Sequence, residues 1–175
     1  MTWPHWPLTF SPRLTVQHAI FVLLLVLLAT EAQAWEGVLV SVHDGDTVVI
    51  APHGAAHGAL LVRLYGIDAP ELDQVGGREA QAALQNLVQP GDAVSVVPLS
   101  GDRYSRVVGL VIHSGLILNY EQIRTGQAWV YPQYCKARFC GEWRRVEESA
   151  RHSHAGLWQI DSPVPPWNWR KNTVR

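Results

Sequence analysis

Two apolar, β-branched runs joined by Asp44-Gly45 constrain the fold of this 175-residue chain more than any other feature. In the first run, residues 35–43, the valines at positions 38, 40 and 42 share one face, as in a strand with one buried side. The second run covers residues 47–51, and an Asp-Gly step between two such runs is a strong hairpin signal. The pattern therefore predicts an antiparallel hairpin.

The rest of the chain continues as a mixture of short strands and helices. Further strands are expected at residues 59–65, 93–99 and 106–113, and helices at 78–88, 119–125 and 142–154. Asn119 is expected to cap its helix, and the Pro- and Trp-rich residues 163–170 are expected to be irregular. Five short strands with a helix after the third favour an α+β fold, a five-stranded OB-fold Greek-key β-barrel with about three α-helices. A β-sandwich and an open sheet are also compatible with the periodicity.

The N-terminal region has the pattern of an export signal. The run from Ala19 to Ala29 contains 11 consecutive apolar residues, and Ala32-Gln33-Ala34 follows as a small-x-small cleavage sequence. An uncleaved membrane anchor is the alternative, but a spanning helix needs roughly 20 apolar residues. We therefore expect residues 1–34 to be a signal peptide and residues 35–175 to form a single domain. The protein is then exported, to the periplasm or the medium.

Two cysteines, Cys135 and Cys140, lie close together in the sequence. In an exported protein an even pair at short range predicts a local disulfide. A zinc site is the alternative, but it would need two further ligands at suitable spacing, and none stand nearby. A structural disulfide is the favoured interpretation.

Charge is unevenly distributed along the chain, although its formal net charge is only −1. Residues 35–134 contain five arginines and ten acids, whereas residues 135–175 contain eight basic residues and four acids. An acidic front half suits a cation site, and a basic C-terminal part suits a polyanion, although a solvated helix face explains the latter equally well.

Three acids and an arginine stand at the ends of the apolar runs: Asp46, Arg63, Asp68 and Glu71. Bringing carboxylates together costs free energy through repulsion unless a cation offsets it. Such a group can hold a hard metal ion and contact a phosphate. Each acid also has a structural explanation, because Asp46 suits a turn and Arg63 could pair with Glu71.

Several segments carry a resemblance to a known family, and they occur in its order and with similar spacing. These segments are Asp44-Gly45-Asp46-Thr47, Arg63 with Asp68-Ala69-Pro70-Glu71, Arg103-Tyr104-Ser105-Arg106, Gly126–Tyr131, and the ending from Gly156 to Arg170. Together they cover roughly residues 36–170. In these segments the chain resembles the staphylococcal (micrococcal) nuclease family.

The resemblance implies an OB-fold barrel with three helices and a Ca²⁺-dependent phosphodiesterase active on DNA and RNA, leaving 3′-phosphate and 5′-hydroxyl ends. Carried over by motif position, Asp46 and Asp68 would bind Ca²⁺ through carboxylates, and Ala69 through its backbone carbonyl. Oxygen ligands suit Ca²⁺, although ligand type alone does not exclude Mg²⁺ or Mn²⁺.

The same resemblance implies roles for the remaining motif residues. Glu71 would act as general base or orient the attacking water, while Arg63 and Arg106 would bind the scissile phosphate. The residues expected to contact substrate are Arg103, Tyr104 and Tyr131. We expect a monomer with no stable membrane association after signal cleavage.

A second hypothesis is a catalytically inactive OB-fold module that binds single-stranded nucleic acid or a partner protein. Degenerate members of the family lack the acidic and arginine residues. This chain retains the complete set, Asp46, Arg63, Asp68, Glu71 and Arg106. The sequence therefore favours the enzyme.

Overall fold

The computed structural model describes residues 33–54, 58–101 and 106–173, and every structural statement below concerns these residues. The expected signal peptide lies outside them except for its last two positions. Within the described ranges, no helix combines the length and apolar character that crossing a membrane requires.

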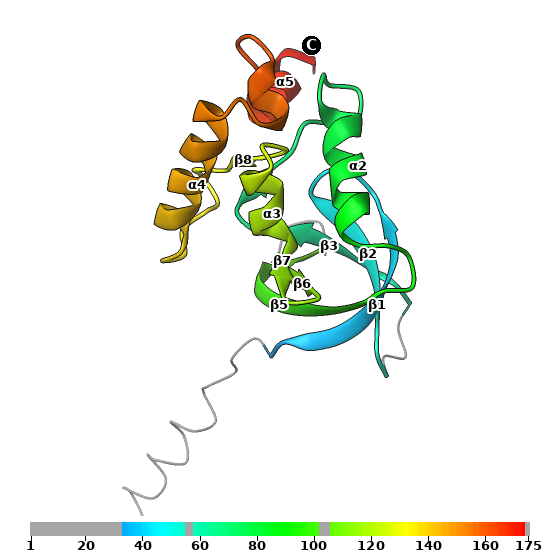
Figure 1. The fold of residues 1–175 in the computed structure, drawn as a ribbon. Coiled ribbons are helices and arrows are strands. Elements are labelled where there is room, and N and C mark those ends of the chain that lie inside the picture. The colour runs from blue at the N-terminus through cyan, green and yellow to red at the C-terminus, as the bar shows by residue number, and fades with distance from the viewer. Residues whose placement is uncertain (1–32, 55–57, 102–105, 174–175) are drawn as a thin grey trace, which may run out of the picture. The chain divides into compact units, whose positions relative to one another are not determined.

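Five strands form a closed barrel (Figure 1): β1 (Trp35–Val42), β2 (Thr47–Pro52), β3 (Leu60–Leu64), β5 (Ala93–Gly101) and β6 (Val107–His113). The sheet order is β3-β2-β1-β5-β6-β7, where β7 is the short strand Leu116–Ile117. A parallel pairing between β3 and β6 closes the sheet on itself. This confirms the predicted α+β barrel and excludes the sandwich and the open sheet.

The expectation that Val38, Val40 and Val42 share the buried face of β1 is wrong, because a register irregularity between Leu39 and Ser41 buries Leu39 and leaves Val40 45% exposed. The apolar residues of β2 and β3 do fill the barrel interior. Val48 and Ile50 of β2 and Val62 and Leu64 of β3 point inward and are almost completely buried. β-Branched side chains suit such pleated, packed surfaces, and successive residues of a strand face opposite sides. The β1–β2 hairpin predicted around Asp44-Gly45 is present, with residues 47–50 of β2 also paired to β3.

Helices gather on one side of the barrel, and α3 (Leu118–Arg124) lies between α2 (Gly77–Leu87) and α4 (Cys140–His152) (Figure 1). A 3₁₀ helix, η1 (Gly156–Gln159), follows α4. Next to the helices, β4 (Ile67–Asp68) and β8 (Trp129–Val130) form a separate two-stranded antiparallel sheet.

The expectation that residues 163–170 are irregular is wrong, because a helix, α5 (Pro166–Thr173), covers most of them. Pro166 occupies the first helical position, where its fixed φ favours a helix and its missing N–H needs no partner. The backbone N–H groups of Asn168 and Trp169 both donate to the carbonyl of Pro165. The proline therefore starts the helix instead of preventing one.

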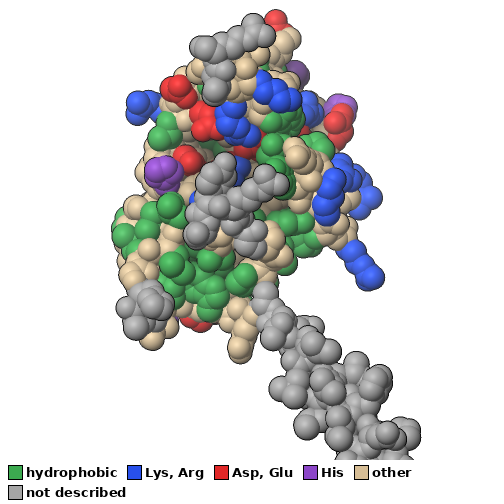
Figure 2. All heavy atoms as spheres, turned by 180° about the vertical axis from the view of Figure 1, so that it is seen from behind, with side chains coloured by type: hydrophobic (Ala, Val, Ile, Leu, Met, Phe, Trp, Pro, Cys, Tyr) green, Lys and Arg blue, Asp and Glu red, His purple; other side chains and the backbone are tan. Residues whose placement is uncertain are grey.

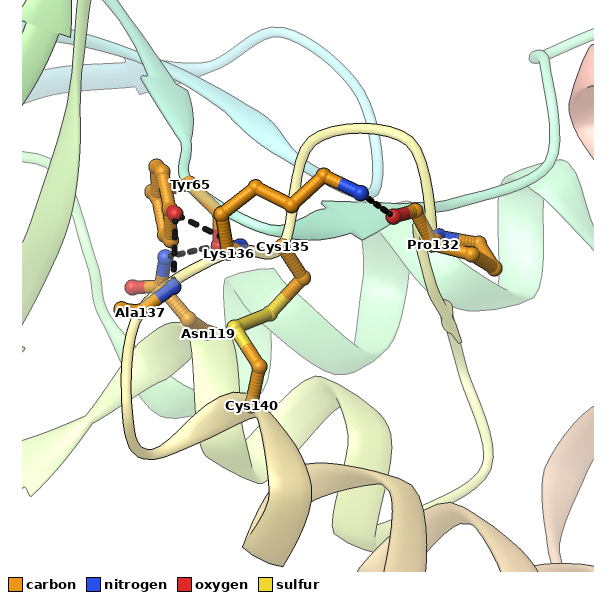
Figure 3. The surroundings of a disulfide bond; sticks show 7 residues. All are labelled: Tyr65, Asn119, Pro132, Cys135, Lys136, Ala137 and Cys140. Atoms are coloured by element: carbon orange, nitrogen blue, oxygen red, sulfur yellow. Dashed lines mark hydrogen bonds between the residues drawn. A yellow bond between two sulfur atoms is a disulfide. The ribbon is translucent and has the colours of Figure 1, made fainter.

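The prediction that Asn119 caps a helix is also wrong. Ile117 is the residue at the N-cap, and Asn119 is completely buried inside α3. Its side-chain amide donates to the carbonyls of Tyr65 (3.0 Å) and Gly109 (3.1 Å), and its side-chain oxygen accepts the N–H of Val111 (3.1 Å). Asn119 thus connects α3 to the barrel, and Figure 3 shows it beside Tyr65.

Asn119→Ala is expected to lower the free energy of unfolding by about 3 kcal/mol, because it removes the side-chain partner of the Val111 N–H and of the Tyr65 carbonyl, and one of two donors to the Gly109 carbonyl. Chemical denaturation measures the change. Asn86→Ala on the exposed side of α2 is the matched control, and we expect it to change stability by less than about 0.5 kcal/mol. Equal denaturation midpoints for the two variants would refute the anchoring role of Asn119.

A disulfide joins Cys135 to Cys140, the first residue of α4, with the two Cα atoms 5.7 Å apart (Figure 3). The intervening loop is also held by Tyr65, whose hydroxyl accepts the N–H groups of Lys136 (3.0 Å) and Ala137 (3.2 Å). The two sulfurs are bonded to each other, which is the arrangement expected of a structural pair.

Candidate active site

Asp46 lies in the β1–β2 turn, just before β2, and is almost completely buried. The carboxylate of Asp44 accepts the N–H of Asp46 (3.0 Å), so Asp44 shapes the turn. One Asp46 oxygen, Oδ2, accepts the backbone N–H of Ala69 at 2.6 Å. The turn and the Asp68-Ala69 segment, 23 positions apart, are therefore directly bonded.

Arg63 of β3 joins two buried carboxylates through one guanidinium. Its Nη1 pairs with Asp46 Oδ1, and its Nη2 lies 2.8 Å from Asp68 Oδ1. These carboxylates, and not Glu71, are the ion-pair partners seen for Arg63, so the alternative Arg63–Glu71 bridge is not the observed arrangement. Burial lowers the pKa of Arg63. The negative charges of Asp68 and Asp44 act in the opposite direction and raise this pKa, but by less.

Glu71 stands on the loop between β4 and α2, which Gln74 holds in place. The N–H of Gln74 donates to the carbonyl of Glu71 (2.9 Å), and the Gln74 side chain accepts the N–H of Glu71 (3.3 Å). The Glu71 side chain is 38% exposed, whereas that of Asp68 is fully buried. We call the group formed by Asp46, Arg63, Asp68, Glu71 and Arg170 the charged cluster. Of its three carboxylates, Glu71 is the one that solvent can reach.

Arg170 of α5 belongs to the same cluster, and the sequence reasoning gave it no role. Its Nη1 lies 2.6 Å from Glu71 Oε1, and its Nη2 lies 2.8 Å from Asp68 Oδ2. Burial opposes the charged form of Arg170, but hydrogen bonds to Asp68 and Glu71 outweigh it and raise its pKa. One feature of the sequence points to this placement. Pro166 can start a helix, and in that helix Arg170, three positions after Trp167, lies on the same face as Trp167.

Arg106 immediately precedes β6 and is half-buried. The parallel pairing of β6 with β3 places Val107 opposite Val62, next to Arg63. The charge of Arg106 contributes to the lowered pKa of Arg63, so the two guanidiniums influence each other. The barrel therefore brings these distant arginines together. Arg103 and Tyr104 lie outside the described residues.

Tyr131 follows β8 and lies next to the charged cluster. Its ring stacks on Trp167 of α5, with centroids 5.1 Å apart and planes 9° from parallel. Tyr131, Trp167 and Arg170 line one surface hollow of about 430 Å³, together with Pro132, Gln133 and Lys171. The aromatic pair and a guanidinium that contacts both Asp68 and Glu71 thus share one hollow.

Charged side chains of both signs adjoin on the upper half of the face seen in Figure 2, whereas hydrophobic side chains cover much of its lower half. The carboxylates and arginines of the cluster likewise lie close enough to pair. A surface of mixed charge is consistent with the small net charge of the chain. Phosphate recognition would therefore depend on a few placed arginines and not on a strongly basic surface.

The donor atoms near Asp46 and Asp68 suit a hard cation. Among residues 33–54, 58–101 and 106–173, no three His, Cys, Asp or Glu side chains form a metal-ligand group. Asp46 and Asp68 nevertheless contact the same guanidinium, and Ala69 is bonded to Asp46. Two carboxylates and a backbone carbonyl, completed by water, fit the oxygen-rich and flexible coordination of Ca²⁺. These ligand assignments remain predictions.

Comparisons with known proteins agree with this arrangement. A family model described as "Staphylococcal nuclease homologue" matches residues 61–160, more than half of the chain. An "Uncharacterized endonuclease" of Escherichia coli is 38% identical over 135 residues, which are 77% of this chain and 84% of the relative. An "Uncharacterized endonuclease" of Haemophilus influenzae is 32% identical over 133 residues, 76% of this chain and 71% of the relative.

A plant relative matches over a smaller share of both chains. The "Staphylococcal-like nuclease CAN1" of Arabidopsis thaliana is 37% identical over 111 residues, which are 63% of this chain and 33% of the relative. The bacterial matches, by contrast, extend over most of both chains. From the family model and these identities, the chain belongs to the staphylococcal nuclease family and is a hydrolase that acts on nucleic acid.

Proposed function

We propose that this protein is a Ca²⁺-dependent endonuclease that hydrolyses phosphodiester bonds of DNA and RNA and leaves 3′-phosphate and 5′-hydroxyl ends. One observation carries the proposal: the carboxylates of Asp46, Asp68 and Glu71 converge on the guanidiniums of Arg63 and Arg170. The carboxylates are the ligands that a hard cation requires, and guanidiniums are the groups that bind a phosphate diester.

Asp46 and Asp68 would hold the cation through their carboxylates, with Ala69 contributing its carbonyl. When bound, Ca²⁺ stabilises the negative charge that develops on the phosphate. Arg63 and Arg106 would donate to phosphate oxygens, because a guanidinium matches them in pairs and stays protonated at any working pH. The closeness of the two arginines across β3 and β6 supports a shared phosphate.

Glu71 would take the proton of the attacking water or orient that water. Its exposure supports this role, since a water molecule must reach the carboxylate that activates it. The buried carboxylate of Asp68 lacks that access. The burial of Asp46 and Asp68 and the exposure of Glu71 support this division into ligands and base.

The substrate would lie across the hollow lined by Tyr131, where aromatic faces suit the stacking of bases. Base stacking is tolerant of sequence, so it suits an enzyme that accepts both DNA and RNA. We expect Arg103 and Tyr104 to add contacts to the substrate. The working form is proposed to be a monomer without stable membrane association.

Export is proposed from two features. The apolar run at residues 19–29 with its small-x-small sequence is typical of a cleaved signal, and the Cys135–Cys140 disulfide is typical of oxidising compartments. The protein would then act in the periplasm or the medium.

EDTA is expected to abolish cleavage of both DNA and RNA by the purified protein, and added Ca²⁺ to restore it, because the cation stabilises charge in the reaction. Replacing Ca²⁺ by Mg²⁺ or Mn²⁺ measures metal preference. The 5′-hydroxyl products should accept label from polynucleotide kinase without prior phosphatase treatment. Intact DNA and RNA at millimolar Ca²⁺ would overturn the proposal and favour the inactive binding module.

Asp46→Asn is expected to weaken Ca²⁺ binding about tenfold or more, because a neutral amide replaces a charged ligand. Isothermal titration calorimetry measures this without any substrate. Asp161→Asn, which neutralises an exposed aspartate outside the charged cluster, is the matched control and should bind Ca²⁺ like the parent. Equal affinity of the Asp46 variant and the control would remove Asp46 from the ligand set.

A further inference from the structure

We propose that Arg170 is a positioning residue of the active site: α5 brings its guanidinium between Asp68 and Glu71, and the guanidinium, anchored on Asp68, fixes the orientation of the Glu71 carboxylate. This inference rests on the proposed function and extends it to a helix that lies outside residues 61–160, the range that the family model matches. Arg170 would act through Glu71 and not on the phosphate itself.

The geometry of the guanidinium supports orientation as its role. Nη1 and Nη2 of Arg170 bind the two oxygens of Asp68 at 3.2 and 2.8 Å, and Nη1 also binds Glu71 Oε1 at 2.6 Å. A planar group bound to both oxygens of a carboxylate has a fixed orientation. The nitrogen that holds Glu71 is therefore itself held, which a lysine, as a point charge, could not reproduce.

Packing around α5 explains how Arg170 is placed. Trp167 stacks on Tyr131 and contacts Trp129 edge-to-face, with centroids 6.5 Å apart. Trp129 of β8 pairs directly with Asp68 of β4, so the same short sheet supports both the helix and the carboxylate. Arg170 follows Trp167 by three positions, which places both on one side of the helix.

A second connection ties the segment before α5 to the loop of Glu71. The side-chain amide of Gln74 donates to the carbonyl of Val164 at 2.6 Å, and the backbone of Gln74 is bonded to Glu71. Gln74 thus connects the backbone of Glu71 to the segment that precedes α5. The two chain segments that carry Glu71 and Arg170 are therefore bonded to each other independently of the side-chain contact.

The balance of charges explains why the contact of Arg170 with Glu71 matters. Asp46, Asp68 and Glu71 contribute three negative charges to the cluster, and Arg63 and Arg170 offset two of them. Without Arg170, Glu71 would be repelled by Asp68 and, being 38% exposed, would turn toward solvent. Loss of Arg170 would therefore misplace the base while making the surroundings of Asp68 more negative.

Arg170→Met is expected to lower turnover at saturating Ca²⁺ and substrate by about tenfold to a hundredfold, the usual cost of removing a group that orients a ligand or base. The dissociation constant for Ca²⁺, measured by calorimetry without substrate, should not increase, because a positive charge has been removed beside Asp68. Arg170→Lys should give an intermediate turnover. Arg124→Met is the matched control, since Arg124 pairs with Glu121 outside the cluster, and it should keep the parent's turnover.

Two results would overturn the inference: turnover of Arg170→Met within threefold of the parent, or a Ca²⁺ affinity that weakens in parallel with turnover, as a merely structural role would produce. A double-mutant cycle of Arg170→Met and Glu71→Met on the folding equilibrium constant is independent of activity, and each substitution removes the contact. We expect a coupling of about fivefold between the two sites, and additive effects would contradict the contact. If the parent itself cleaves neither DNA nor RNA, the proposed function fails. The double-mutant cycle then still tests whether Arg170 and Glu71 interact.

Discussion

Glu71→Gln should lower turnover by about 10²–10⁴-fold, the range that a positioned general base contributes. The amide keeps the shape of the side chain and still offers Arg170 an oxygen to bond, so the fold should persist. What disappears is the ability to accept a proton from water. Turnover measured under single-turnover conditions, with thermal unfolding beside it, separates loss of catalysis from loss of structure.

Asp73→Asn is the control for this prediction, because it neutralises an exposed carboxylate two positions away on the same loop. Turnover of that variant should match the parent. If Glu71→Gln retained full turnover, another group would have to activate the water. A fall of equal size in both variants would point to the loop's net charge and not to Glu71.

Gly77→Ala should destabilise the protein by about 2–4 kcal/mol and reduce turnover strongly. Gly77 is the first residue of α2, and a Cβ atom there would collide with the carbonyl oxygen of Glu71 and lie 2.6 Å from its carbonyl carbon. Backbone atoms cannot rotate away as a side chain can, so the loop carrying Glu71 must move. A displacement of about 1 Å in a catalytic group can cost 10²-fold in rate.

Gly141→Ala on α4 provides a matched comparison, since a Cβ atom at that position meets nothing within 4 Å. Alanine is favoured over glycine inside a helix by roughly 0.5–1 kcal/mol, so this variant should be slightly more stable than the parent. Chemical denaturation and turnover are measured for both variants. Parent-like behaviour of Gly77→Ala would show that the Glu71 loop shifts without consequence.

The strands of the barrel could be predicted from the sequence because their signals are local, whereas closure of the barrel depends on the distant β3–β6 pairing. An alternating run at 38–42 and a β-branched run at 47–51, separated by Asp44-Gly45, indicate strands and a turn without knowledge of the rest of the chain. The structure places β1 and β2 within one residue of these predictions. The grouping of Asp46, Arg63 and Asp68 then follows, since each stands at or near the end of a paired strand.

Asn119 and Arg170 could not be predicted in the same way, because tertiary partners decide their roles. Asn119 has the side chain of a good N-cap, but buried carbonyls of Tyr65 and Gly109 bind it instead. The eight residues of α5 are too few to be stable as an isolated helix. Stacking of Trp167 on Tyr131 stabilises α5. The sequence of residues 163–170 does not indicate that Tyr131 is the partner.

The contacts of Arg170 span 102 residues to Asp68 and 99 residues to Glu71. A chain that closed β3 against β6 but lacked α5 would hold both carboxylates without the guanidinium that orients Glu71. Cleavage competence is then a property that depends on the C-terminal helix as well as on the barrel.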